Sequence, residues 1–233
     1  MRDDENSLTF YPSSLIPHPL SPVAAILLAA GRSRRMGAFK PLLPFGEKTV
    51  AETVVENLLA AGTAEIVCVV GHRAAELRAR LAHLPVKFAL NEEAESEMGV
   101  SIARGVESVS EAASAALVAL VDQPAVPVAS IRQVANEHLR HGARLVVPTW
   151  QGRGGHPVLV SLDFREELRR LDARRGLRAL FDSYRDEVRR VEVESPFVAR
   201  DMDTWDDYCA LHLEVFGVVP PSQKAVDEDG QGV

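Results

Sequence analysis

Cysteine is scarce in this sequence: Cys68 and Cys209 are the only two among 233 residues, and 141 positions separate them. A disulfide-stapled scaffold is therefore excluded, and there is no Cys-x-x-Cys pair to hold zinc or exchange disulfides. Hydrophobic residues make up 46% of the chain and charged residues 25%. These proportions exclude collagen-like and wholly disordered chains, so we expect a globular protein with both cysteines reduced in its core.

The sequence also lacks an excess of positive charge and any long apolar run. Its 26 basic and 33 acidic residues give a net charge of −7, which argues against an electrostatic nucleic-acid binder. No apolar run approaches the roughly 18 residues of a membrane span. The first residues show neither the basic segment nor the apolar stretch of a secretory signal. We therefore expect a cytoplasmic protein with no membrane or nucleic-acid partner.

Proline, glycine and acidic residues gather at the two ends. Four prolines and no apolar period occur in residues 1–22, and residues 217–233 are rich in proline, glycine and acid. Such composition predicts flexible tails at 1–22 and 213–233 around one domain at 23–212. Within that domain, short apolar runs at 23–29, 65–70, 86–90, 115–121 and 145–147 alternate with helical periods at 49–61, 74–84, 100–109 and 129–141.

Strands that are apolar on both faces and alternate with helices predict an α/β fold. Its three layers would be a mostly parallel, Rossmann-like sheet between helices. In such open sheets, ligands bind beyond the carboxyl ends of the strands. The residues that follow each apolar run are therefore the candidates for function.

A glycine-rich basic loop follows the first run. Residues 31–40 contain Arg32, Arg34, Arg35 and Lys40 and no acid. Gly31 and Gly37 permit tight backbone turns and let amide groups approach an anion, while guanidinium groups match phosphate oxygens in pairs. The loop predicts a polyphosphate cradle, although a solvated turn with incidental arginines is the alternative. It lacks the Gly-Lys-Ser/Thr of a Walker loop and the second glycine of the dinucleotide fingerprint.

Two aspartates are candidate metal ligands. Asp122 follows the longest apolar run and precedes Pro124, a placement that suits Mg²⁺, which binds one or two carboxylates plus phosphate oxygens. Asp203 precedes Thr204, which can cap the last helix and leave Asp203 directed elsewhere. The alternatives are a helix cap for Asp122 and a helix-entry acid for Asp203. Neither aspartate has a partner in its own motif, so we expect its removal to leave the fold intact.

Several further polar residues follow other strands. Asn91 follows the third run, and Gly99 and Ser101 open the next helix, where amide donors gather. Arg153 and His156 precede the apolar run HPVLV, and His156 either binds an anion or bonds its own loop. We interpret His72 as a loop histidine that is satisfied locally. We interpret His138 and His141 as a solvated helix face, because no third metal ligand is near.

Residues 28–40, Leu-Ala-Ala-Gly-x-Ser-x-Arg-Met-Gly-x-x-Lys, resemble the signature of the sugar-nucleotide-type nucleotidyltransferases. The similarity is strongest to the molybdenum cofactor cytidylyltransferase branch, since the guanylyltransferase branch has glycine where Ala30 stands. The resemblance implies the nucleotide-diphospho-sugar transferase fold, with Arg35 and Lys40 neutralising the departing pyrophosphate. It also implies a nucleotide site formed by Leu28, Ala29, Ala30, Gly31, Arg32, Ser33 and Gly37, with Asn91, Gly99 and Ser101 near the base.

Asp122-Gln-Pro and Asp201-Met-Asp-Thr resemble the two metal motifs of that family, which implies Mg²⁺ held by Asp122 and Asp203. Arg153 and His156 match its acceptor loop. The implied reaction joins the CMP part of CTP to the phosphate of molybdopterin, releases pyrophosphate and supplies a molybdenum-containing enzyme. Two alternatives stay open. One is a related enzyme that uses GTP or another phosphorylated acceptor, and the other is a non-catalytic carrier of nucleotide or molybdenum cofactor.

Overall fold

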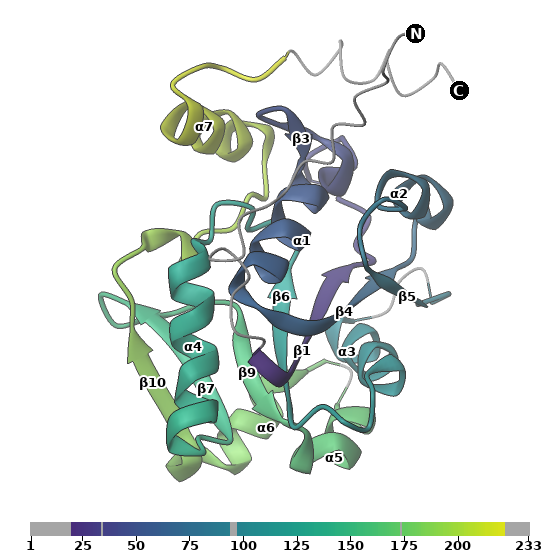
Figure 1. Ribbon diagram of the computed structural model, residues 1–233. Coiled ribbons are helices and arrows are strands. Elements are labelled where there is room, and N and C mark those ends of the chain that lie inside the picture. Colours follow the sequence, from purple (N-terminus) through teal and green to yellow (C-terminus); the bar gives the residue numbers. More distant parts are fainter. Residues whose placement is uncertain (1–19, 34, 94–96, 173, 222–233) are drawn as a thin grey trace, which may run out of the picture.

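A computed structural model describes residues 20–33, 35–93, 97–172 and 174–221. Figure 1 shows a central sheet with helices on both faces, which confirms the three-layer α/β fold. Of the expected tails, residues 1–19 and 222–233 lie outside the described residues. In the described parts, β1 already begins at Leu20, and the last helix continues to Phe216. Arg34 also lies outside them.

The sheet orders its strands β10-β7-β9-β6-β1-β4-β5, and β8 pairs with β7. The strand bounds are β1 (Leu20–Ala29), β4 (Thr63–Val70), β5 (Lys87–Leu90), β6 (Ala115–Leu120), β7 (Leu145–Trp150), β8 (Arg153–Gly154), β9 (Val158–Ser161) and β10 (Val188–Glu192). A separate hairpin joins β2 (Pro44–Phe45) to β3 (Lys48–Thr49). Strand β9 runs antiparallel to both of its neighbours, so its beginning lies where β6 and β7 end.

The helices divide between the two faces. One face is covered by α1 (Val50–Ala61), α2 (Ala74–Arg80), α4 (Val128–His141) and α7 (Trp205–Phe216). The other is covered by α3 (Met98–Ser108), α5 (Arg165–Arg169) and α6 (Leu177–Ser183). Short 3-10 turns at Lys40–Leu42, Leu162–Phe164, Arg185–Glu187 and Pro196–Ala199 connect these elements. Among the residues described, no helix has the length and apolar character needed to cross a membrane.

The core explains why the central strands are apolar throughout. Along β1, Val23, Ala25 and Leu27 pack into the cluster under α1 and α4, whereas Ala24 and Ile26 pack into the cluster under α3. Side chains alternate between the two faces of a strand, so a sheet covered on both faces needs apolar residues at every position.

Hydroxyl and carboxyl side chains fix the starts of α1 and α7. Thr49 caps α1 in a reciprocal capping box with Glu52, and Thr204 caps α7 in the same way with Asp207. The predicted cap at Thr204 is thus confirmed. Helix α3 begins at Met98, two residues before the predicted start, and its N-cap residue makes no side-chain cap bond.

Candidate active site

A cleft of about 400 Å³ opens where β1 and β6 end. It is lined by Leu28, Ala30, Gly31, Arg32, Ser33, Lys40, Pro41, Glu93, Met98, Ser101, Leu120, Val121 and Asp122. Its volume falls in the range of small-molecule sites, which typically combine apolar walls with a few polar groups. The fold therefore brings eight of the predicted site residues to one cleft: Leu28, Ala30, Gly31, Arg32, Ser33, Lys40, Ser101 and Asp122.

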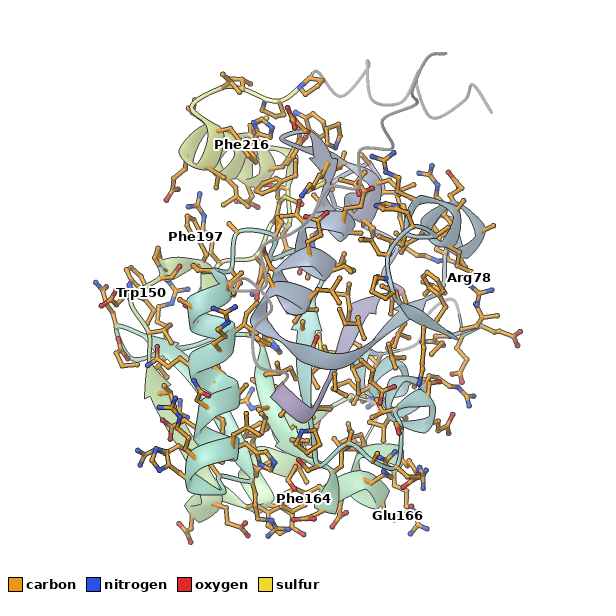
Figure 2. All side chains as sticks on the ribbon, viewed as in Figure 1. Arg78, Trp150, Phe164, Glu166, Phe197 and Phe216 are labelled. Atoms are coloured by element: carbon orange, nitrogen blue, oxygen red, sulfur yellow. The ribbon has the colours of Figure 1, made fainter. Side chains whose placement is uncertain are left out.

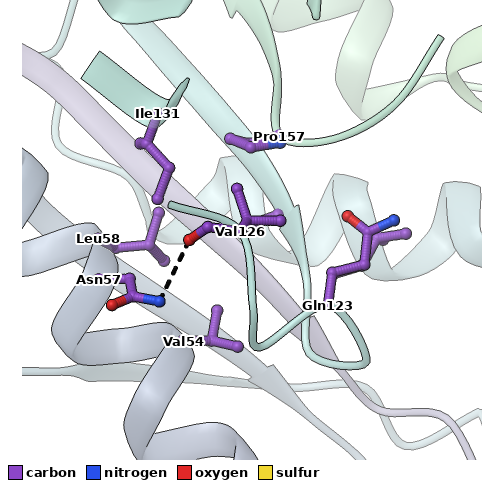
Figure 3. A pocket seen from close by; sticks show the side chains of 9 residues that line it. Val54, Asn57, Leu58, Gln123, Val126, Ile131 and Pro157 are labelled. Atoms are coloured by element: carbon purple, nitrogen blue, oxygen red, sulfur yellow. Dashed lines mark hydrogen bonds between the residues drawn. The ribbon is translucent and has the colours of Figure 1, made fainter. Parts of the chain in front are cut away.

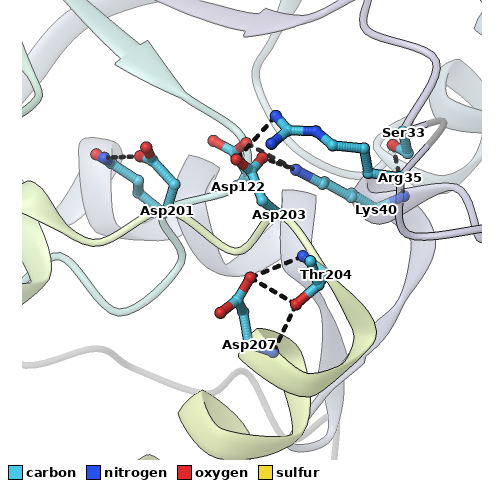
Figure 4. A network of polar contacts seen from close by, with 9 residues as sticks. Ser33, Arg35, Lys40, Asp122, Asp201, Asp203, Thr204 and Asp207 are labelled. Carbon is cyan, nitrogen blue, oxygen red and sulfur yellow. Dashed lines mark hydrogen bonds and ion pairs between the residues drawn. The ribbon is translucent and has the colours of Figure 1, made fainter.

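Lys40 joins the two predicted aspartates (Figure 4). Its Nζ donates to Asp122 Oδ2 at 3.0 Å and to Asp203 Oδ1 at 2.9 Å. The lysine side chain is only 10% exposed, and its backbone N–H donates to Ser33 Oγ at 3.1 Å. The partner shared by the two aspartates thus comes from outside both of their motifs, because the fold supplies one cation to both across 82 and 163 residues of chain.

The two carboxylates have different surroundings. Hydrogen bonding from Lys40 lowers the pKa of Asp203, and the charges of Lys40 and Arg35 act in the same direction. Arg35, which is exposed, reaches Asp203 Oδ2 at 2.8 Å. Burial raises the pKa of Asp122, and this effect outweighs the opposing charge and hydrogen bond of Lys40. The charged form of Asp203 is thus stabilised by its neighbours, whereas the charged form of Asp122 would be stabilised by any further positive charge.

Neither aspartate caps a helix. At the start of α7, Thr204 Oγ accepts from the backbone N–H of Asp207, whose own carboxylate accepts from the backbone N–H of Thr204 (Figure 4). Asp203 is left to face Lys40. Helix α4 begins at Val128 with Pro127 as its N-cap residue, several residues beyond Asp122. The geometry thus rules out the helix-cap alternative for Asp122, while Asp203 lies at the entry to α7 and also bonds Lys40.

The loop behind Asp122 is fixed by residues that the sequence did not single out. Asn57 of α1 donates to Pro124 O at 3.1 Å and to Val126 O at 3.3 Å, beside a small apolar cavity of about 10 Å³ (Figure 3). Gln123 donates to Asp201 Oδ1 at 2.7 Å and so links the two aspartate motifs. Gln123 and Asp201 are close in sequence to the predicted residues Asp122 and Asp203, whereas no sequence pattern points to Asn57.

Four predicted nucleotide-site residues do not line the cleft. Ala29 packs in the core, and Gly99 and Asn91 are buried. Asn91 nevertheless acts on the cleft, because its Nδ2 donates to Ser101 Oγ at 2.9 Å. Gly37 lines a neighbouring cavity.

The predicted acceptor residues lie at the start of β9 and on the β8 hairpin. The His156–Pro157 peptide is cis, and the His156 N–H donates to Val198 O at 2.7 Å. His156 Nδ1 lies 3.2 Å from Val118 O of β6, so the ring bonds a neighbouring strand rather than its own loop. Burial lowers the pKa of His156. The imidazole is therefore neutral at pH 7, with Nδ1 donating and Nε2 left as an acceptor. Arg153 is exposed.

Two further histidines, His138 and His72, make contacts within the fold. His138 lies 2.9 Å from Ser114 Oγ and 3.0 Å from Ala143 O, so it is tied down rather than part of a solvated face. His72 packs edge-on against Phe39 at 6.0 Å. Within the described ranges, no group of three or more His, Cys, Asp or Glu side chains is placed to hold a metal. Asp122 and Asp203, which both bond Lys40, offer two carboxylates, the type of oxygen donor that a hard divalent cation binds.

Comparisons with known proteins identify the family of this chain. Residues 25–188 match the family model described as the MobA-like NTP transferase domain. The chain is 28% identical over 193 residues to the molybdenum cofactor cytidylyltransferase of Escherichia coli (strain K12), covering 81% of this chain and 95% of that one. It is 34% identical over 149 residues to the nicotine blue oxidoreductase of Paenarthrobacter nicotinovorans, covering 64% of this chain and 67% of that one.

A similar solved structure is Rv0371c of Mycobacterium tuberculosis H37Rv. It superposes with a TM-score of 0.74 at 31% identity and covers 82% of this chain and 97% of that one. A second crystal structure of the same protein is a complex with manganese, with a TM-score of 0.70. The fold is thus common to this chain and to these solved structures.

Proposed function

The chain belongs to the MobA-like NTP transferase family and is a nucleotidyltransferase, and we propose that it joins the CMP part of CTP to the phosphate of molybdopterin. The observation that carries this proposal is the contact of Lys40 with both Asp122 and Asp203 at the mouth of the cleft. A phosphate of the acceptor attacks the α-phosphorus of the triphosphate, and pyrophosphate leaves. Such chemistry depends on positioning and charge neutralisation rather than on a protein nucleophile.

The proposed roles follow from charge and position. Gly31, Arg32 and Ser33 line the cleft and bind the triphosphate, while Lys40 and Arg35 neutralise the leaving pyrophosphate. Asp122 and Asp203 hold a divalent cation, Mg²⁺ in this proposal. When bound, the cation supplies positive charge to the phosphate oxygens. The raised pKa of Asp122 fits this role, because a carboxylate with a raised pKa is stabilised by a nearby cation.

We assign CTP as the nucleotide from the residues that are proposed to surround its base in the cleft. Ala30 stands where the guanylyltransferase branch has glycine, and its methyl group favours the smaller pyrimidine. Met98 and Ser101 line the same cleft, and Asn91 holds the Ser101 hydroxyl. The name of the Escherichia coli relative supports CTP and molybdenum cofactor. GTP or another phosphorylated acceptor remains the alternative within this reaction class.

The acceptor is placed by His156 and Arg153 in this proposal. A neutral imidazole attracts no anion by charge, so His156 accepts a hydrogen bond at Nε2, while Arg153 supplies the positive charge. A molybdenum-containing enzyme would receive the product in the cytoplasm.

Oxidoreductase activity is the second candidate function, because the relative from Paenarthrobacter nicotinovorans carries that name. A non-catalytic carrier of nucleotide or molybdenum cofactor is the third. Lys40, Asp122 and Asp203 form one ion-paired cluster, and this arrangement favours transferase chemistry over both.

The deciding experiment has two steps. Thermal shifts with Mg²⁺ and each of the four ribonucleoside triphosphates identify the donor, because a bound ligand raises the unfolding temperature by mass action. Pyrophosphate release is then measured with the preferred triphosphate and molybdopterin. We expect CTP to give the largest shift and the faster release. A larger shift and higher kcat/KM with GTP would remove the cytidylyl assignment, and binding without pyrophosphate release would favour the carrier.

The Lys40→Ala variant tests the proposed role of Lys40 in the pyrophosphate-release assay. Removing a cation that faces growing negative charge typically costs about a hundredfold or more in turnover. Lys48→Ala is the matched control, because Lys48 is exposed and pairs only with the exposed Glu56 among the described contacts. Wild-type turnover by the Lys40 variant would refute the assignment of this lysine to the phosphates.

A further inference from the structure

A second cavity, of about 260 Å³, lies against the glycine-rich loop. It is lined by Arg32, Ser33, Gly37, Ala38, Phe39, His72 and Arg73. Arg32 and Ser33 also line the nucleotide cleft, so they form a wall shared by the two spaces. Of these two spaces, Lys40 and Asp122 line only the cleft. The second cavity, which the glycine-rich loop and residues 72–73 line, is here called the annex.

The chemistry of the annex suits a small anion. Its lining includes two guanidinium groups and one imidazole and no carboxylate. The Arg73 guanidinium lies 5.1 Å from the centre of the Phe39 ring, and the His72 ring meets the same ring edge-on. Its volume falls below the range typical of drug-sized ligands. Guanidinium groups recognise phosphate oxygens through paired hydrogen bonds.

The backbone on both sides of the annex adopts an uncommon conformation. Ser33 has φ 52° and Arg73 has φ 56°, in the left-handed region that residues with a β-carbon rarely enter. A side chain at Gly71 would meet Ala30 O at 3.0 Å and Asn91 O at 3.2 Å. Glycine at this position therefore lets the end of β4 approach the loop closely and brings His72 and Arg73 to its outer side.

We propose that the annex binds the terminal phosphates of a polyphosphate, with Arg73 and His72 as the residues that hold them. The proposal rests on the proposed function, in which pyrophosphate leaves from the cleft across the Arg32–Ser33 wall. The same chemistry has two sources, the tail of a bound triphosphate and the pyrophosphate released after transfer.

Glu76 allows a test in which anion binding should become stronger instead of weaker. Arg73 Nε donates to Glu76 Oε1 at 2.6 Å, and the Nη2 group pairs with the other carboxylate oxygen. Glu76 does not line the annex, yet it competes for the guanidinium that the anion needs. Removing its charge should therefore strengthen anion binding, whereas removing the charge of Arg73 should weaken it.

The test is calorimetric titration of the full chain, in Mg²⁺, with inorganic pyrophosphate, CMP and CTP. We expect Arg73→Gln to weaken pyrophosphate binding about tenfold, the typical effect of losing a charged hydrogen bond. His72→Asn should weaken it less and Glu76→Gln should strengthen it, and CMP affinity should not change in any of them. Arg78→Gln is the matched control. It removes the same charge from α2, the helix that Arg73 immediately precedes (Figure 2), but the Arg78 guanidinium lies over the Phe88 ring at 5.7 Å.

The results distinguish the two sources of the bound phosphates and also show when the proposal fails. Weaker binding of both pyrophosphate and CTP to Arg73→Gln assigns the annex to the triphosphate tail, and weaker binding of pyrophosphate alone assigns it to the released product. The proposal is overturned if wild-type protein fails to bind pyrophosphate or if the Arg73 and Arg78 variants behave alike. It is also overturned if Arg73→Gln loses CMP affinity by the same factor, which would make Arg73 a packing support for Phe39. Because binding is measured directly, pyrophosphate affinity without nucleotidyl transfer would refute the proposed function and leave the annex standing.

Discussion

At the scale of single residues, the cluster around Lys40 changes what the aspartates are expected to do. Asp203 faces two cations, and Asp122 faces Lys40 in a more buried setting. The sequence predicts both acids as metal ligands because each follows a strand or precedes a cap. It gave no sign of their shared lysine, since only the folded sheet brings the three segments together.

Asparagine substitutions at Asp122 and Asp203 test whether the two carboxylates act together. Asp122→Asn and Asp203→Asn should each lower transferase activity by orders of magnitude, while the double variant should be hardly worse than either, because groups that act as a unit are non-additive. Each single variant still leaves Lys40 one carboxylate partner. For the partly exposed Asp203 we therefore expect a loss of unfolding free energy of no more than about 1 kcal/mol. Urea denaturation and turnover are the measurements, and additive losses in turnover would contradict a shared metal.

Gly31 provides a second test at this scale. A β-carbon at Gly31 would meet nothing within 4 Å, and the residue lines the cleft. Gly31→Ala should therefore keep the wild-type unfolding temperature but weaken triphosphate binding, because the added methyl group stands where the phosphates approach the backbone.

Gly105→Ala is the matched comparison for Gly31→Ala. Its β-carbon would lie 2.4 Å from Ile26 Cγ2, where α3 packs on β1, so it should lose about 1–3 kcal/mol of stability, as overpacked cores do. Thermal unfolding and CTP titration separate the two effects. Unchanged CTP affinity in Gly31→Ala would mean that the phosphates do not approach this backbone.

At the scale of elements, the sequence predicts the strands and helices well because burial on both faces leaves a plain signal. The continuous apolar runs mark β1, β4 and β6, and the capping residues mark the start of α7. The antiparallel direction of β9 is not predictable in this way, because a run such as HPVLV is apolar whichever way the strand runs. That direction is what brings His156 to the ligand-binding edge of the sheet.

The cap of α7 supports a prediction about pH. The hydrogen bond from the Thr204 hydroxyl lowers the pKa of Asp207, and the Thr204 backbone N–H adds to the effect. A carboxylate with a lowered folded-state pKa stabilises the protein fully above its unfolded pKa and loses that contribution as the pH falls through the folded value. Thr204→Ala should therefore cost about 1 kcal/mol at neutral pH, and the difference from wild type should shrink below about pH 4.

Urea denaturation of both proteins at neutral pH and near pH 3 measures this difference, with Thr204→Ser as the control that keeps the hydroxyl. Because the cap also sets the direction in which Asp203 leaves the helix, Thr204→Ala should lower turnover as well. A constant difference in stability across this pH range would show that Asp207 does not contribute through the cap.

At the scale of the whole molecule, every residue assigned to the site lies between β1 and the start of α7. The two core clusters run from Val23 to Leu211, and His212 Nδ1 holds Val218 O at 2.8 Å beyond the last helix. Stability of a single domain resides in such a continuous buried core. All of these contacts lie within residues 20–221, and the one at Val218 falls inside the segment 213–233 that the sequence predicts as a tail.

A chain trimmed to residues 20–221 should therefore keep the unfolding temperature of the full chain within a few degrees, since roughly 1 kcal/mol shifts it by only about 2–4 °C for a protein of this size. Its kcat and KM for the triphosphate should match those of the full chain, because the cleft, the annex and both aspartates remain.

Further removal of residues 213–221 is the informative comparison. It deletes Phe216, which packs against Phe45 at 4.8 Å between ring centres, and the Val218 carbonyl held by His212, so that variant should unfold at a clearly lower temperature. If trimming to 20–221 already lowered the unfolding temperature as much as the deeper truncation, residues 1–19 or 222–233 would belong to the folded domain, and domain ends at residues 20 and 221 would be wrong.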